Sequence, residues 1–179
     1  MAGPAPGPVL RLALGLERGT TALALAGAVL CLCVAAATAF WQVATRFALG
    51  QPSTWTEVVT RSAMIWCVFL GLAPTIRQGA IIAVDLLPRL LAGRARRALV
   101  LGGIGLSMLF FSILAWQGAA MTARVARQNL AALDVSIAWV YAALPAGSAF
   151  ALVALLACAL REIAGLPPPG PASAASVDP

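Results

Sequence analysis

The sequence predicts an all-α integral membrane protein with four transmembrane helices and a short cytoplasmic interfacial helix between spans two and three. Three observations support this class. Of the 179 residues, 61% are hydrophobic and only 10% are charged, against about 25% charged residues in an ordinary soluble domain. Long uncharged intervals separate the charges, and the arginines are distributed unevenly between the segments that join these intervals. This composition excludes a disordered charged chain and disfavours a water-soluble domain.

The first span is predicted at about residues 20–45, after a cytoplasmic N-terminal segment over 1–19. A bilayer core of ~30 Å needs about 20 apolar residues in a helix, and the uncharged interval from Gly19 to Thr45 is long enough. Basic residues before the interval and Ala35-Ala36-Ala37 within it resemble a cleaved signal peptide. The apolar run continues through Phe40 to Val43, beyond such a cleavage site, and this favours a retained helix.

The second span is predicted at about residues 54–76. Thr54-Trp55-Thr56-Glu57 matches the capping box at a helix start. Glu57 and Arg61 stand four residues apart in the favourable order for an ion pair on one helix face. We therefore expect a polar corner at the outer end of this span, formed by Arg46, Trp55, Glu57 and Arg61. It either only caps the helix and pairs its charges, or it is a candidate interface for a partner protein or a neighbouring membrane subunit.

The loop after the second span is predicted to lie in the cytoplasmic membrane interface. Leu86 and Leu87 can face the bilayer while Asp85 and Arg89 face water, and Pro88 divides the segment into two short pieces. The arginine cluster favours anionic lipid head groups over a nucleic acid. The candidate lipid-interface residues are Arg77, Asp85, Arg89, Arg94, Arg96 and Arg97.

The remaining spans are predicted at about 98–123 and 135–160, which completes a membrane domain over 20–162. A proline-rich tail over 163–179 has no core-forming pattern and is expected to be disordered. Small residues recur at four-residue spacing and permit close helix contact, either within the bundle or with another subunit. These candidate interface residues are Gly103, Ser107, Ala143, Gly147 and Ala151.

Arginine placement predicts the orientation of the spans. Eight of the twelve arginines fall in the N-terminal segment, the 77–97 loop and the stretch that directly follows the last predicted span, where Arg161 stands. By the positive-inside rule, both termini and the middle loop are expected in the cytoplasm.

Several kinds of chemistry are excluded or disfavoured by the residue types. The chain has no histidine, so a histidine-based triad or metal site cannot form. The four cysteines lie inside the predicted spans without a C-x-x-C motif and are expected to be buried apolar residues. The acids Glu57, Asp85, Asp134 and Glu162 avoid the middle of every long neutral interval, unlike a proton-coupled exporter. We therefore expect no catalytic residue, metal or cofactor in this chain.

The order of residues along the first two spans resembles the small membrane subunit of TRAP transporters, the DctQ-like family of tripartite ATP-independent periplasmic transporters. The resemblance rests on Arg46, Trp55-Thr56-Glu57, Arg61, Trp66, Phe69-Leu70-Gly71, Arg77-Gln78-Gly79 and Val84-Asp85-Leu86-Leu87. The last span adds Trp139-Val140-Tyr141 followed by Leu144-Pro145-Ala146-Gly147. The similarity covers roughly residues 20–162.

This resemblance implies a non-catalytic scaffold in the bacterial inner membrane. Such a subunit packs against a large permease subunit that holds the substrate and sodium sites, and a periplasmic binding protein delivers the substrate, commonly an organic acid. In the family a second acid often follows the one that matches Glu57, whereas this chain has Val58. An ion pair that the family builds with that second carboxylate would have to use Glu57 in this chain.

Two other classes remain as alternatives. One is a self-sufficient small four-span transporter or channel, which the missing mid-membrane acid disfavours. The other is a membrane enzyme or redox protein, disfavoured because no histidine, paired acids or nucleophile constellation is present. The resemblance implies that the other two components select the transported substrate.

Overall fold

The computed structural model describes residues 8–48, 50, 54–78, 94–130 and 133–165. Its long helices are α1 (Pro8–Ala48), α2 (Thr54–Arg77), α4 (Arg94–Val125) and α6 (Ala143–Ala164), and the short α5 (Ala138–Tyr141) precedes α6. Within these described ranges, four helical segments are long and apolar enough to cross a membrane, with α5 and α6 counted together. The predicted all-α class with four transmembrane helices is confirmed.

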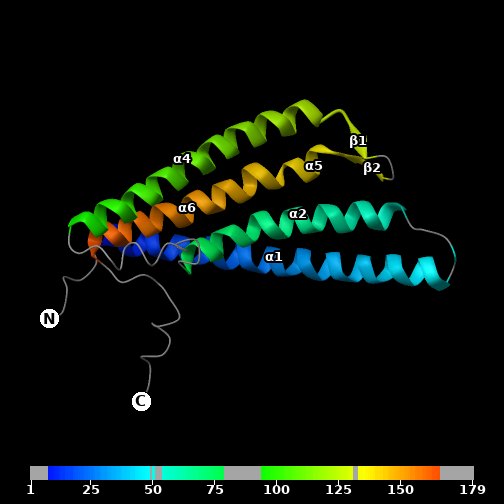
Figure 1. Ribbon diagram of the computed structural model, residues 1–179, viewed down its shortest axis with the longest axis horizontal. Coiled ribbons are helices and arrows are strands. Elements are labelled where there is room, and N and C mark those ends of the chain that lie inside the picture. Colours follow the sequence, from blue (N-terminus) through cyan, green and yellow to red (C-terminus); the bar gives the residue numbers. More distant parts are fainter. Residues whose placement is uncertain (1–7, 49, 51–53, 79–93, 131–132, 166–179) are drawn as a thin grey trace, which may run out of the picture.

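Consecutive long helices run in opposite directions (Figure 1). α1 packs along α2, α6 packs against α2 and α4, and α6 also touches α1. α1 and α4 begin at the end of the bundle where α2 and α6 finish, and we call this the Glu17 end. The opposite end, which we call the hairpin end, carries a small two-stranded ribbon.

The ribbon consists of β1 (Asn129–Leu130) and β2 (Leu133–Ser136), which pair antiparallel. Ser136 Oγ donates a hydrogen bond to the Ala126 carbonyl and accepts one from the Ala138 N–H. Because residues 133–136 are extended and paired, the last helical segment starts at Ala138 rather than near residue 135 as expected.

The first helix is longer than the span expected from the sequence. It begins at Pro8 instead of near residue 20 and contains 41 residues, which at 1.5 Å per residue corresponds to about 60 Å. At its other boundary α6 continues through Ile163 and Ala164, which were expected to belong to the tail. The expected interfacial helix between spans two and three and the tail beyond Gly165 lie outside the described residues.

Small side chains dominate the centre of the bundle. Ala24, Ala73, Ala151 and Ala154 are almost completely buried, and Phe111 packs against this cluster. Small residues allow helix backbones to approach closely. Because lipid is as apolar as the core, membrane helices gain little by burying apolar surface and depend on such close packing contacts. Among the described residues of α4, only Phe111 and Gly118 are buried, so most of this helix faces outward.

Candidate functional site

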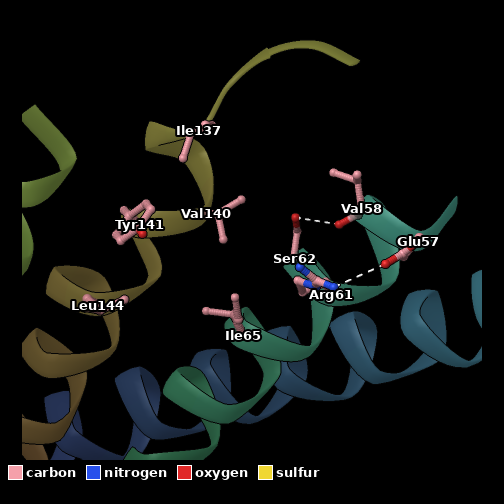
Figure 2. A pocket seen from close by; sticks show the side chains of 9 residues that line it. All are labelled: Glu57, Val58, Arg61, Ser62, Ile65, Ile137, Val140, Tyr141 and Leu144. Carbon is pink, nitrogen blue, oxygen red and sulfur yellow. Dashed lines mark hydrogen bonds and ion pairs between the residues drawn. The ribbon is translucent and has the colours of Figure 1, made fainter. Parts of the chain in front are cut away.

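A groove opens at the hairpin end between α2 and the α5–α6 segment (Figure 2). Its volume is about 450 Å³. The lining residues come from the first turns of α2 and from the start of the last helical segment: Glu57, Val58, Arg61, Ser62, Ile65, Ile137, Val140, Tyr141 and Leu144. The groove therefore lies beside the polar corner that the sequence predicted.

The walls of the groove are mainly apolar, and charged groups stand at its edge. Arg61 Nη2 donates to Glu57 Oε1 at 3.2 Å, and both side chains are well exposed (Figure 2). The Ser62 hydroxyl donates to the Val58 carbonyl. A groove of this kind suits an apolar group whose polar end meets the Glu57–Arg61 pair. Val58 belongs to the apolar wall.

Two tryptophans join the walls near this groove. The Trp66 indole N–H donates to the Trp139 carbonyl at 3.1 Å, and the two ring centroids are 5.5 Å apart. This contact connects α2 to α5 across residues that are distant in the sequence. It limits how far the two walls can separate.

We expect Trp66→Phe to lower the free energy of unfolding by about 1 kcal/mol, because phenylalanine keeps a ring but cannot donate to the Trp139 carbonyl. Reversible unfolding of the purified subunit in detergent measures this change. Trp116→Phe is the matched control, because Trp116 is 78% exposed. An equal effect of the two substitutions would contradict a specific role for the Trp66 hydrogen bond.

The other predicted interface residues fall into two groups. Arg46 and Trp55 are exposed at the hairpin end, and Gly103 lies open on α4, where an added Cβ would meet nothing within 4 Å. Ser107 is partly buried on the same helix. Ala143, Gly147 and Ala151 are instead buried inside the chain. Those three therefore serve the internal packing of α6 and offer no surface to a partner.

The Glu17 end holds a buried charge cluster. Glu17 Oε2 accepts a hydrogen bond from Arg161 Nη2 at 2.8 Å, and Glu17 Oε1 lies 3.2 Å from Arg77 Nε. The Glu17 side chain is 1% exposed, that of Arg161 11% and that of Arg77 27%. One carboxylate thus connects α1, α2 and α6, and Arg77, which was expected at the lipid interface, is directed to this acid.

The same end also joins α4 to α6. Arg97 Nη2 donates to the Ile163 carbonyl at 2.7 Å, and Arg96 Nη1 lies 4.0 Å from Glu162 Oε1. Arg94 is exposed at the start of α4. Of the other predicted lipid-interface residues, Asp85 and Arg89 lie outside the described residues.

Sequence reasoning assigned no role to Glu17, because it fell in a segment expected to precede the membrane domain. The signal that could have revealed Glu17 is its place in the repeat of inward-facing residues along α1. In α1 the inward positions Glu17, Thr21, Ala24, Ala28, Cys31, Ala35, Thr38, Gln42 and Thr45 follow alternating steps of four and three residues. Such a pattern marks the seam of a packed helix. Glu17 lies on this seam, and Arg18 beside it is exposed.

Comparison with known proteins decides the family. The family model described as "Tripartite ATP-independent periplasmic transporters, DctQ component" matches residues 35–165. The chain belongs to this DctQ family. It is thus a small permease subunit of a TRAP transporter, a class of transporter in which a large permease and a periplasmic binding protein also take part.

A curated relative of this DctQ-family chain is the sialic acid TRAP transporter small permease protein SiaQ of Vibrio cholerae serotype O1. The two are 29% identical over 113 residues, which is 62% of this chain and 64% of the relative. The chain therefore spans less than two thirds of the relative's length. Glu17 lies before the part that the DctQ model matches, whereas Arg77 and Arg161 lie inside it.

Proposed function

We propose that this DctQ-family subunit is a non-catalytic scaffold of a sodium-driven transporter for organic acids, which holds the large permease subunit and helps to seat the periplasmic binding protein. The carboxylates support this role. Glu17 and Glu57 are in ion pairs with arginines, and Glu162 lies 4.0 Å from Arg96. These are all the acids whose side chains the structure describes. They serve the packing and the surface of the helices, and we place the sodium site in the large subunit.

The chain is proposed to lie in the bacterial inner membrane with both termini in the cytoplasm. The Glu17 end then faces the cytoplasm, and its described arginines agree with the positive-inside rule. The hairpin end faces the periplasm, so that the groove and the Glu57–Arg61 pair are on the side from which a binding protein approaches. The relative named for sialic acid fits an organic acid as the substrate class.

Co-expression with a large TRAP permease subunit from the same organism, followed by purification from detergent, tests the scaffold role. We expect the two chains to be recovered together and to support uptake in vesicles only when the binding protein is added. Recovery of this chain alone, with a robust transport activity of its own, would overturn the proposal in favour of a self-sufficient transporter.

Glu57→Gln tests the proposed docking corner. An exposed ion pair contributes at most about 1 kcal/mol to stability, so we expect the complex yield to remain unchanged. Uptake at limiting concentrations of binding protein should fall, because the substitution removes a charge from the docking face. Glu162→Gln is the matched control, since it makes the same change at the opposite end of the bundle. Unchanged uptake by Glu57→Gln would leave that carboxylate without a docking role.

A further inference from the structure

The buried charge cluster at the Glu17 end raises the question of what it contributes. One carboxylate faces two arginines, and three buried atoms around it have no hydrogen-bond partner: Glu17 Oε1, Thr21 Oγ1 and Arg161 Nε. Buried ion pairs with incomplete hydrogen bonding stabilise a fold poorly compared with apolar side chains of similar size. Their best-attested benefit is to fix how helices align, as single buried polar residues do in coiled coils.

The apolar part of the α1–α2 contact is repetitive. Along the seam of α1, Ala24, Ala28 and Ala35 are buried small residues. The facing positions of α2 are also small or hydroxylated at Thr56, Thr60, Ala63 and Cys67, again in steps of four and three. If α1 slid along α2 by one seven-residue repeat, small residues would again face small residues. Packing of this kind discriminates weakly between alignments.

Specific contacts between α1 and α2 are few in the described part of the chain. The Thr38 and Thr60 hydroxyls are hydrogen-bonded at 2.7 Å, and the flexible end of Leu70 lies over Gly27. After a slide, Thr38 or Thr60 would meet another small polar residue of the seam, so that this hydroxyl contact could be replaced. Glu17 has no such substitute, because a displacement by one repeat would separate it from both Arg77 and Arg161.

We propose that Glu17 is the positioning residue that sets the alignment of α1 against α2 and α6. Its position within the fold suits this role. Arg77 ends α2 and Arg161 lies in the last turn of α6, where a cation is favourable next to the carbonyl end of a helix. Glu17 can satisfy both arginines only when α1 is at one height and one rotation. With α1 held at this height, the repetitive seam brings Thr38 opposite Thr60.

Cysteine cross-linking in membranes can report the alignment directly. In a chain whose native cysteines are replaced by serine, Thr38→Cys with Thr60→Cys reports the observed alignment. A cysteine restored at Cys31, or introduced as Thr45→Cys, reports with Thr60→Cys an alignment shifted by one repeat in either direction. We expect the first pair to cross-link efficiently upon mild oxidation and the other two pairs weakly.

Glu17→Gln keeps the size of the side chain and removes its charge. We expect the ratio of observed to shifted cross-links to fall at least roughly tenfold, which corresponds to about 1.4 kcal/mol. Glu57→Gln, the same change in an exposed pair, should leave the ratio unaltered. Glu17→Asp retains the charge and should keep most of the cross-link between positions 38 and 60. This holds even if Glu17→Gln abolishes the cross-links of all three cysteine pairs.

An unchanged ratio in Glu17→Gln would overturn the proposal. Loss of the observed cross-link in both Glu17→Gln and Glu17→Asp would also overturn it, because the site would then depend on the shape of glutamate instead of its charge. Neither result depends on transport or on the large subunit, so the proposed scaffold function is tested separately.

Discussion

Replacing Gly147 with alanine is expected to lower the free energy of unfolding of the isolated subunit by about 1–3 kcal/mol, the usual cost of overfilling a packed core. At this position α6 crosses α2 closely. An added Cβ would lie 2.6 Å from Phe69 Cβ and 2.7 Å from the Phe69 carbonyl oxygen. Because two of the atoms within 3 Å belong to the Phe69 backbone, a change of side-chain rotamer cannot relieve the clash, and the helices must separate.

Gly103→Ala is the matched control for this prediction. An added Cβ at Gly103 meets nothing within 4 Å, and alanine favours a helix over glycine by up to about 1 kcal/mol. We therefore expect Gly103→Ala to leave the stability of the isolated subunit unchanged or slightly higher. Unfolding in detergent followed by circular dichroism measures both variants. Equal stability of the two would contradict the close approach of α6 to α2.

The spans could be predicted because a charge in hydrocarbon is costly over the whole length of a helix. Long neutral intervals therefore mark the spans without any knowledge of which helices touch. The Glu57–Arg61 pair could also be predicted, since residues four apart on a helix meet whatever the rest of the chain does. Both inferences depend only on local sequence, and the structure contains both features.

The role of Glu17 depends on contacts that local sequence does not encode. Its partner Arg161 is 144 positions away in the chain, and the two meet only because α1 and α6 pack at one particular height. The same limit applies to Ala143, Gly147 and Ala151. Their spacing predicts close contact with some helix, but the tertiary arrangement decides that the partner lies within the chain.

The ribbon at the hairpin end was missed for a different reason. Val135 and Ile137 continue the apolar pattern of the last span, and a short apolar run does not distinguish a strand from the start of a helix. The pairing of β1 with β2 and the two hydrogen bonds of Ser136 decide in favour of the extended form. Such contacts are tertiary, although Ser136 lies only ten residues from Ala126.

The two arginines that share Glu17 are expected to differ in importance. We expect Arg161→Gln to lower the free energy of unfolding by about 3–5 kcal/mol, because it removes the partner that hydrogen-bonds the buried carboxylate. Arg77→Gln should lower it by about 1 kcal/mol, since a partly exposed pair is screened by solvent. The distances to Glu17, 2.8 Å for Arg161 and 3.2 Å for Arg77, agree with this order.

The double variant Glu17→Gln/Arg161→Gln separates the ion pair from mere loss of side-chain packing. Removing both partners leaves no unpaired buried carboxylate, so its loss of stability should be smaller than the sum of the two single losses. Arg127→Gln, an exposed arginine near the hairpin end, should have almost no effect. If the losses of Glu17→Gln and Arg161→Gln instead add in full, the two residues contribute independently. The buried carboxylate would then not be held by Arg161, and Arg77 would have to be its main partner.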